Sequence, residues 1–202
     1  MIRAFLAVEL PESLRTQVSQ VQRRLKQRLE WDLPRSVRLS WVRPPSIHLT
    51  VKFLGDIPED LVEPLRRAMT QAIGSHRALQ IPLDRLGVFP RPQQPRVLWV
   101  GPSEIWERGE AAARLTAWHR TVEKASVSLG LAPDQRALSP HLTIARIKAG
   151  EAEFGKCLAR SGETEQPLAL GALSVDSIVL MKSELNPRGS IYTTLWTVRL
   201  ES

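Results

Sequence analysis

Apolar positions recur along the chain with two periods, and the change from one period to the other marks the predicted elements. A period of two predicts strands at about 2–10, 48–54, 79–88, 96–100, 141–147, 172–181 and 191–199. A period near 3.6 predicts helices after Pro11, after Pro58, at 105–129 and at 151–160. Pro-rich loops and a turn at 186–189 separate these segments. The mixture of short strands and amphipathic helices predicts an α+β fold.

The helical segments show which residues face the core. In the first helix one face is apolar, while the other consists largely of Arg and Gln. His76 and His119 lie outside the apolar stripes, and we expect both at the surface. The residues expected in the core are Leu14, Val18, Val21, Leu25 and Leu29 in the first helix and Leu115, Trp118, Val122, Ala125 and Leu129 in the third.

The order of elements after His48 recurs after His141, at an offset of 93 residues. The pairs Leu98-Trp99 and Leu195-Trp196 match at an offset of 97, so a short insertion reconciles the two halves. We expect one domain over residues 1–202, built from two interleaved, duplicated lobes. Each lobe would carry an antiparallel sheet packed by helices, and a pseudo-two-fold axis would relate the lobes across a central cleft.

The chain has 202 residues, of which 43% are hydrophobic and 24% charged. This composition excludes a disordered or fibrous chain. The single cysteine, Cys157, excludes an intrachain disulfide and a cysteine-based zinc site, and it fits a reducing compartment. The first residues do not resemble a signal peptide, and no stretch approaches the roughly eighteen apolar residues of a membrane span. We therefore expect a cytoplasmic protein with no membrane association.

The balance of 28 Lys and Arg against 21 Asp and Glu gives a net charge of +7. Such a charge attracts polyanions such as nucleic acids, although scattered charge that only solvates the surface is the alternative. Trp41 and Phe89 are candidates to stack on a base, but core packing is the more frequent role of a single aromatic residue. A candidate rim for binding a nucleic-acid backbone consists of Arg43, Arg91, Arg96 and Lys148.

The segments 48–51 (HLTV) and 141–144 (HLTI) carry the candidate chemistry. Because side chains alternate along a strand, His48 and Thr50 share one face, and His141 and Thr143 do the same in the second copy. The Cβ atoms of each pair lie about 6.6 Å apart, so one phosphoryl group can touch both side chains. Chance produces two such HxT motifs from four histidines in about 1.5% of cases, so the pair indicates a site.

Two histidines related by a two-fold axis suit the opening of a cyclic phosphodiester. One imidazole takes a proton from the attacking water, and the other protonates the leaving oxygen on the opposite apical side. With ordinary pKa values near 6.5, one histidine can be neutral and the other protonated near neutral pH. The threonine hydroxyls can donate to the non-bridging phosphate oxygens. A metal site is the weaker interpretation because neither motif contains an acidic residue, so we expect no metal and no cofactor.

Several further segments accompany the two motifs: 41–48 (WVRPPSIH), 53–55 (FLG), 87–90 (GVFP) and 95–101 (PRVLWVG). Together they make the chain resemble the bacterial and archaeal RNA 2′,3′-cyclic phosphodiesterases. These proteins were formerly called 2′-5′ RNA ligases and belong to the two-histidine phosphoesterase superfamily. The resemblance covers nearly the whole chain, from Arg3 to Trp196.

The resemblance implies a bilobal α+β fold and metal-independent hydrolysis of RNA 2′,3′-cyclic phosphate ends to 2′-phosphomonoesters. It also implies a weak, reversible ligation of tRNA halves through a 2′-5′ linkage. In this family's pattern His48 resembles the proton donor to O3′ and His141 the base for water, whereas the symmetry of the sequence does not distinguish acid from base. Thr50 and Thr143 would hold the phosphate. We expect a monomer whose partner is RNA with such an end.

Two basic residues near the motifs are candidates for an additional phosphate contact. Strict alternation places Arg146 on the back face with Leu142 and Ile144, unless a bulge turns it round, and a surface salt bridge is its alternative role. The same alternation places Lys52 on the front face, beyond Thr50, which makes it geometrically the better candidate.

Two other functions remain open from the sequence. A related phosphoesterase can act on a small nucleotide such as ADP-ribose 1″,2″-cyclic phosphate, which competition between nucleotides and RNA ends would reveal. A non-catalytic RNA-binding module needs the basic rim but no pair of histidines. The presence of both HxT motifs favours an enzyme over such a module.

Overall fold

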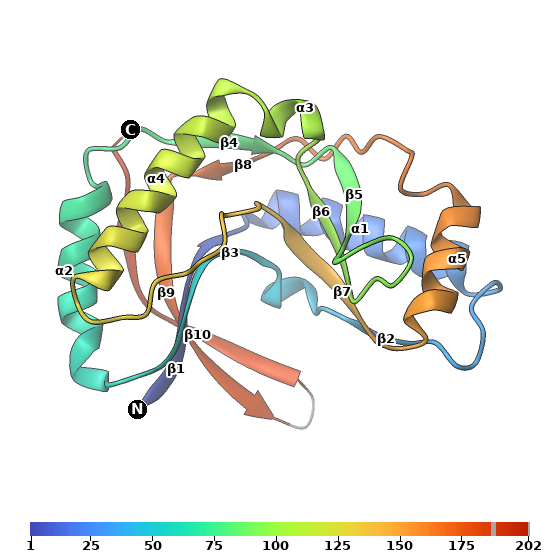
Figure 1. The fold of residues 1–202 in the computed structure, drawn as a ribbon, viewed down its shortest axis with the longest axis horizontal. Helices are drawn as coiled ribbons and strands as arrows, with labels where there is room; N and C mark the ends of the chain where they lie inside the picture. The colour runs from blue at the N-terminus through green and yellow to red at the C-terminus, as the bar shows by residue number, and fades with distance from the viewer. Residues whose placement is uncertain (187–188, 202) are drawn as a thin grey trace.

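The computed structural model describes residues 1–186 and 189–201. Figure 1 shows the helices arranged around one large twisted sheet, with both chain ends on the same side of the molecule. The helices are α1 (Glu12–Leu29), η1 (Pro44–Ser46), η2 (Glu59–Leu61), α2 (Val62–Ile73), α3 (Glu104–Glu107), α4 (Glu110–Val127) and α5 (Glu151–Ser161). The strands are β1 (Ile2–Glu9), β2 (Arg38–Trp41), β3 (His48–Ile57), β4 (Leu79–Pro82), β5 (Arg85–Phe89), β6 (Val97–Gly101), β7 (Leu142–Ala149), β8 (Ala172–Val175), β9 (Ser177–Asn186) and β10 (Gly189–Arg199).

Within the described residues, eight strands form one antiparallel sheet in the order β10-β9-β1-β3-β7-β6-β5, and β2 pairs with β7 off this path. Strands β4 and β8 form a separate two-stranded sheet. The predicted α+β fold is confirmed. Residues 187 and 188 of the predicted turn at 186–189 lie outside the described residues.

The large sheet divides where β3 meets β7. On one side, β10, β9, β1 and β3 are covered by α2 and α4, and we call this the β1 half. On the other side, β7, β6, β5 and β2 are packed by α1 and α5, and we call this the β7 half. The chain crosses repeatedly between the halves, since α1 of the β7 half follows directly on β1. The two halves share a sheet, and they join through the pairing of Leu49 with Leu142.

The predicted apolar stripe of α1 is buried, as its helical spacing requires. The helix expected at 105–129 is instead two helices, because Gly109, a poor helix former, lies between α3 and α4 as the N-cap of α4. The strand expected at 79–88 is also divided, with β4 ending at Pro82 and β5 joining the large sheet. None of the helices in residues 1–186 and 189–201 has the length and apolar character that crossing a membrane requires.

Candidate active site

The two HxT motifs meet where β3 pairs with β7. Leu49 pairs with Leu142, and in an antiparallel pair the residue before each leucine lies beside the residue after the other. His48 is therefore placed beside Thr143, and His141 beside Thr50. Both leucines are 1% exposed, so the histidines and threonines occupy the opposite face of the sheet. The structure brings together the four residues that the sequence singled out.

A cavity of about 210 Å³ opens on this face of the sheet. His48, Thr50 and Thr143 line it, and Arg146 lies on the same wall. Phe5 and Tyr192 close the side formed by the β1 half. A second arginine, Arg3 of β1, also lines the cavity. The imidazole, hydroxyl and guanidinium groups therefore present hydrogen-bond donors and two fixed positive charges to an anion.

His48 is held between two aromatic rings and a backbone carbonyl. Its ring stacks on Phe5 with centroids 4.7 Å apart, and Tyr192 meets it edge-on at 5.2 Å. Its Nδ1 lies 2.9 Å from the carbonyl oxygen of Ser46. Because a carbonyl oxygen only accepts, Nδ1 carries a proton, which leaves Nε2 for exchange with a ligand.

His141 has the same arrangement built from different residues. Its Nδ1 lies 2.8 Å from the carbonyl oxygen of Ser139, and Phe89 meets its ring edge-on at 5.0 Å, with Trp99 at 6.3 Å. The recurrence of Ser at the second position before each histidine was visible in the sequence, although only the structure shows that the serine carbonyl is the group used. Both imidazoles are thus fixed in one tautomer with Nε2 available.

The environment lowers the pKa of both histidines. Burial lowers the pKa of His48 to about 4; the hydrogen bond to Ser46 opposes this shift, and the charges of Arg146 and His141 add to it. Burial likewise lowers the pKa of His141. The hydrogen bond to Ser139 raises this pKa, and the charge of Arg146 lowers it further. Both imidazoles are therefore neutral near pH 7 in the free protein, and the expected mixture of one neutral and one protonated histidine requires a bound anion.

Each HxT motif is followed by a β-bulge. In β3, Ala7 pairs with Thr50 and Leu6 with Lys52, which leaves Val51 as the extra residue. In β7, Trp99 pairs with Thr143 and Leu98 with Ala145, which leaves Ile144 as the extra residue. A bulge shifts all later side chains to the opposite face. The strict alternation expected from the sequence is therefore wrong directly after Val51 and Ile144, and in β3 a second shift follows at Leu54.

The bulge in β7 turns Arg146 toward the cavity. Arg146 is exposed and lines the cavity with both threonines, whereas Ala145 and Ile147 are buried on either side of it. The back-face placement expected from strict alternation is wrong, and the bulge considered as its exception is the observed structure. The charge of Arg146 also lowers the pKa of both His48 and His141.

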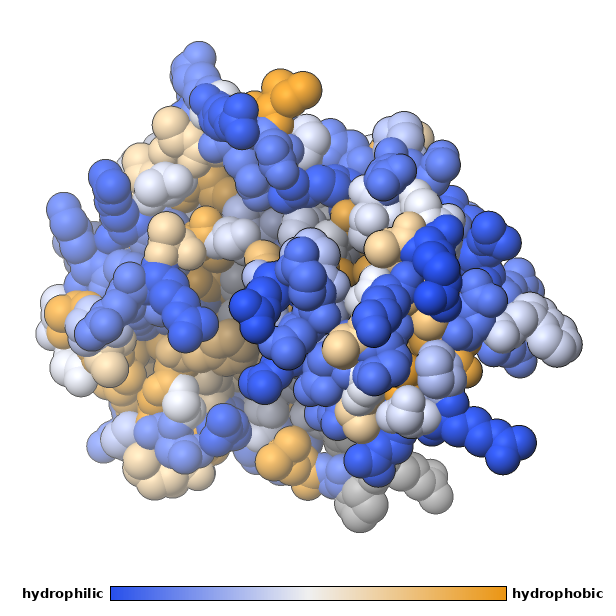
Figure 2. All heavy atoms as spheres, turned by 45° about the vertical axis from the view of Figure 1, so that its right-hand side comes forward, coloured by the Kyte–Doolittle hydropathy of each residue, from blue (hydrophilic) through white to orange (hydrophobic). Residues whose placement is uncertain are grey.

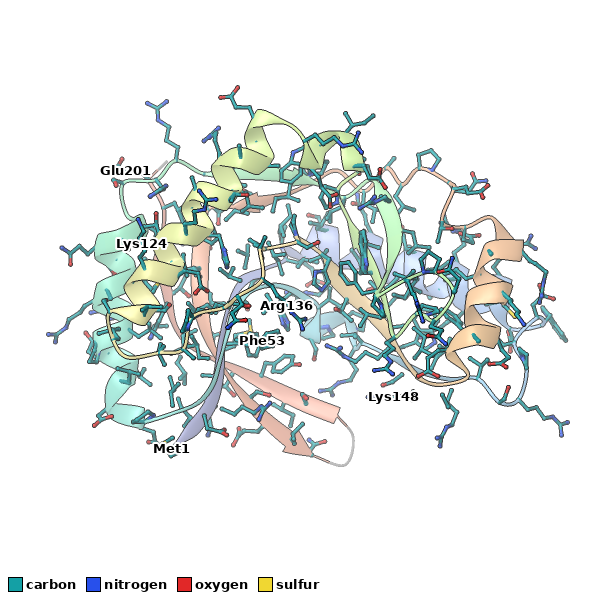
Figure 3. All side chains as sticks on the ribbon, in the orientation of Figure 1. Met1, Phe53, Lys124, Arg136, Lys148 and Glu201 are labelled. Carbon is teal, nitrogen blue, oxygen red and sulfur yellow. The ribbon has the colours of Figure 1, made fainter. Side chains whose placement is uncertain are left out.

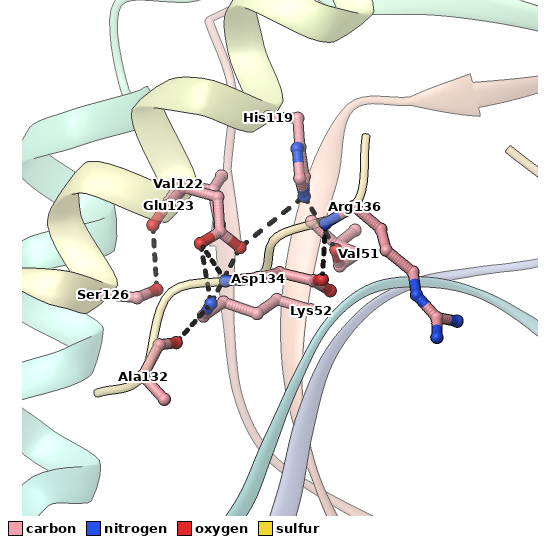
Figure 4. A network of polar contacts seen from close by, with 9 residues as sticks. All are labelled: Val51, Lys52, His119, Val122, Glu123, Ser126, Ala132, Asp134 and Arg136. Carbon is pink, nitrogen blue, oxygen red and sulfur yellow. Dashed lines mark hydrogen bonds and ion pairs between the residues drawn. The ribbon is translucent and has the colours of Figure 1, made fainter. Parts of the chain in front are cut away.

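The bulge in β3 turns Lys52 away from the cavity. The front-face position predicted for Lys52 is therefore wrong. Lys52 is 2% exposed, and its Nζ donates to both carboxylate oxygens of Glu123 at 2.8 and 2.7 Å. It also donates to the carbonyl of Ala132 at 2.9 Å, and Glu123 accepts from the Asp134 backbone N–H (Figure 4). All of its polar partners lie behind the sheet, so Lys52 cannot serve as a phosphate ligand in this conformation.

Phe53 takes the front-face position that Lys52 was expected to hold. It lines the cavity and is 69% exposed, and it lies near the centre of the molecule in Figure 3. Strict alternation from His48 would place Phe53 on the back face with Leu49, and the bulge at Val51 brings it to the front instead. A large exposed aromatic ring at the mouth of a polar cavity offers a stacking surface.

His119 is another residue whose predicted position is wrong. It is 6% exposed, and its Nε2 lies 3.1 Å from the carbonyl oxygen of Val51, with Glu123 at 3.7 Å (Figure 4). It occupies a position of the apolar stripe of α4 between Leu115 and Val122, four residues after Leu115. His76 is partly exposed.

Of the candidates for nucleic-acid contact, the aromatic residues pack against neighbouring side chains and the basic residues are exposed. Trp41 is partly buried, with the ammonium group of Lys26 5.1 Å from its ring, and Phe89 packs against Trp99 and His141. Hydrophilic side chains cover most of the face in Figure 2, interrupted by scattered apolar ones. The candidate backbone contacts Arg43, Arg91, Arg96 and Lys148 are all exposed.

The part of the chain that the structure describes contains no cluster of three or more His, Cys, Asp or Glu side chains arranged to hold a metal ion. The cavity itself is lined by His48, the two threonines and the guanidinium groups of Arg3 and Arg146, and His141 lies beside Thr50 through the strand pairing without lining the cavity. Together these groups match acid–base chemistry on an anion.

Comparison with known proteins shows a match to the family described as LigT-like phosphoesterase over residues 8–99 and 106–192. A protein of Methanothermobacter thermautotrophicus named RNA 2′,3′-cyclic phosphodiesterase is 33% identical over 199 residues, covering 98% of this chain and 99% of that protein. One of the same name from Aquifex aeolicus is 31% identical, covering 96% and 95%. Among solved structures, E. coli LigT with 3′-AMP superposes with a TM-score of 0.71 at 22% identity, covering 100% and 99%. TT0787 of Thermus thermophilus gives 0.67 at 26% identity, covering 98% and 97%.

The burial of Lys52 gives a prediction about stability. We expect Lys52→Met to lower the free energy of unfolding by about 3 kcal/mol, because the largely buried carboxylate of Glu123 loses its partner. The double variant Lys52→Met/Glu123→Leu removes both charges and is expected to lose less than half as much. Urea unfolding followed by circular dichroism measures both values.

Lys182→Met is the matched control for this pair. Lys182 and Glu184 form an exposed ion pair at 3.1 Å, so we expect its loss to cost between about 0 and 1 kcal/mol. Equal losses in the single and the double variant at Lys52 and Glu123 would contradict the interpretation that an unpaired buried charge is the cause.

Proposed function

The chain belongs to the LigT-like phosphoesterase family, and on that premise we propose that it hydrolyses RNA 2′,3′-cyclic phosphate ends to 2′-phosphomonoesters. The observation that carries the proposal is the pairing of two HxT motifs around one cavity that also holds Arg146. The names of the relatives in Methanothermobacter thermautotrophicus and Aquifex aeolicus support the choice of RNA as the substrate.

In the proposed reaction His141 is the base and His48 the acid. The Nε2 of neutral His141 takes a proton from water as the water oxygen bonds to phosphorus. The bond from phosphorus to O3′ breaks on the opposite apical side, and protonated Nε2 of His48 gives its proton to O3′. The phosphate stays on O2′. The serine carbonyls, by holding both Nδ1–H groups, keep each Nε2 directed at the reaction.

The remaining side chains of the cavity would bind the phosphate. Thr50 and Thr143 donate to its non-bridging oxygens, where charge builds up during attack, and Arg146 supplies the positive charge. The bound anion then raises the pKa of both histidines, which gives the pair the proton that it lacks in the free protein. Phe53 offers its exposed ring to the base next to the cyclic phosphate.

The finer features expected from the sequence stay part of this proposal. They are a weak, reversible 2′-5′ ligation of tRNA halves, a monomeric protein in the cytoplasm, hydrolysis that needs no metal, and a single domain of two duplicated, interleaved halves. The duplication is supported by matching features 93 residues apart: the serine carbonyl, the HxT motif and the bulge. Exposed Arg43, Arg91, Arg96 and Lys148 are the proposed contacts to the RNA backbone.

Replacement of either histidine tests the acid–base mechanism. We expect His48→Ala and His141→Ala each to lower kcat by at least about 100-fold without unfolding the protein, and Thr50→Ala and Thr143→Ala to cost less. A cyclic phosphate substrate with a nitrophenolate leaving group needs little protonation, so it should rescue His48→Ala far more than His141→Ala. Rescue of His141→Ala alone would reverse the two roles, and normal turnover in either variant would exclude the mechanism.

The low pKa of both histidines predicts the pH dependence. The reaction needs one proton on the pair, with His48 protonated and His141 neutral, and kcat/KM reports on the free protein. The pKa of His48 is about 4 and that of His141 is below 6.5. We therefore expect kcat/KM to reach its maximum below pH 6.5 and to decrease as the pH rises above that maximum. The maximum of kcat should lie at higher pH, because the bound phosphate raises both pKa values. Initial rates across the pH range measure both curves, and coinciding maxima above pH 7 would contradict this.

Chelation tests the absence of a metal from the reaction. We expect activity on an RNA with a 2′,3′-cyclic phosphate end to be unchanged after dialysis against EDTA, with the product identified as the 2′-phosphate. Loss of activity in EDTA that zinc, manganese or magnesium restores would instead require a metal in the mechanism.

A further inference from the structure

We propose that Gln22 and His119 are positioning residues that hold the bulges behind the two HxT motifs, Gln22 acting through Arg146 and His119 through Phe53. The experiments that measure turnover depend on the proposed function, whereas the NMR titration described below does not. Neither residue touches the cavity, since both come from helices packed behind the sheet.

A bulge leaves the extra residue outside the regular ladder of backbone hydrogen bonds. For Ile144 in β7, the carbonyl accepts from the amide of Gln22 at 2.8 Å and from the backbone N–H of Val42 at 3.0 Å. The same Gln22 nitrogen donates to the carbonyl of Val42 at 2.8 Å. One amide group therefore ties the bulge to the segment that follows β2.

The bulge in β3 has an equivalent support. The carbonyl of its extra residue, Val51, accepts from Nε2 of His119 at 3.1 Å. Val51 and Ile144 both follow the threonine of an HxT motif directly, and the two donors come from α4 and α1, the helices behind β3 and β7. Two different side chains thus perform the same task at equivalent positions, which indicates that the fold needs a donor there.

Both donors occupy positions that an apolar residue would normally fill. Gln22 is 3% exposed within the apolar stripe of α1, and His119 is 6% exposed within that of α4. A buried polar group is unfavourable unless its hydrogen bonds are made. Without His119 the Val51 carbonyl loses its donor from α4. Without Gln22 the Ile144 carbonyl keeps only the Val42 N–H, and the Val42 carbonyl loses the Gln22 donor. Loss of either donor therefore favours the regular alternation without a bulge.

Regular alternation would change the cavity in a defined way. In β7 it would turn Arg146 to the back face and bring Ala145 forward, and in β3 it would replace Phe53 by Lys52. The donor on each helix thus decides which side chain faces the substrate. For Gln22 the consequence is that the positive charge of Arg146 leaves the cavity, while that of Arg3 stays.

A double-mutant cycle tests the link between Gln22 and Arg146. Gln22→Met keeps the size and removes the donor, and we expect it to lower kcat/KM by about 10-fold or more. Arg146→Gln should cost at least as much. If Gln22 acts through Arg146, the double variant should be no worse than Arg146→Gln alone, whereas multiplication of the two losses would overturn the proposal. Gln27→Met, on the exposed face of the same helix, is the matched control and should leave kcat/KM unchanged.

A second readout needs no turnover. Arg3, Arg146 and Tyr192 line the same cavity as His48, and His141 lies across the strand pair. The charge of Arg146, and that of His141 when it is protonated, lower the pKa of His48. NMR titration of the His48 ring should therefore show a higher pKa in Gln22→Met, a similar rise in Arg146→Gln and no additional rise in the double variant. An unchanged His48 pKa in Gln22→Met would overturn the proposal.

The two readouts separate this inference from the proposed function. A wild-type protein inactive on RNA 2′,3′-cyclic phosphate would contradict the proposed function, and the His48 titration would still decide the role of Gln22. If Gln22→Met does not fold, Gln22→His enters the same cycle, because it supplies the donor that His119 supplies in the other half. We expect Gln22→His to retain more than half of the wild-type activity. Activity as low as that of Arg146→Gln would contradict the role of the donor.

Discussion

Where β3 and β7 meet, the antiparallel pairing of Leu49 with Leu142 fixes how the two HxT motifs face each other. The buried leucines set the sheet face, and the pairing places each histidine beside the threonine of the other motif. The serine carbonyls then fix the imidazole tautomers, and the bulges choose the next side chain to enter the cavity. The relative position of the two HxT motifs therefore follows from this one contact between the two halves of the sheet.

The α+β fold and the shared face of each histidine with its threonine could be predicted because they depend on local patterns, namely alternation on a strand and periodicity on a helix. Lys52, Phe53 and Arg146 could not be placed, because a bulge depends on the partner strand, which the local sequence does not show. The burial of Lys52 likewise depends on Glu123, 71 residues further along. One signal was available and overlooked: Gln22 and His119 are polar residues within apolar stripes, which is typical of buried groups with a fixed partner.

The free protein is organised to receive an anion rather than to hold a proton in advance. Burial keeps both imidazoles neutral near pH 7, while Arg146 keeps a fixed positive charge beside the hydroxyls. In the proposed mechanism a neutral ligand leaves the histidine pair without the proton that acid–base catalysis needs, whereas a phosphodiester anion restores it. Selectivity for anionic substrates is thus built into the ionisation of the site as well as into its hydrogen-bond donors.

The repeated crossing of the chain between the two halves also governs how the protein forms. β1, at the start of the chain, lies between β3 and β9, and β9 comes from its last quarter. Pairings between residues so distant in sequence form slowly and require nearly the whole chain. During synthesis on the ribosome, β1 stays without one of its neighbours until β9 has emerged. The site, whose wall includes Tyr192 of β10, is therefore completed only after β9 and β10 have been synthesised.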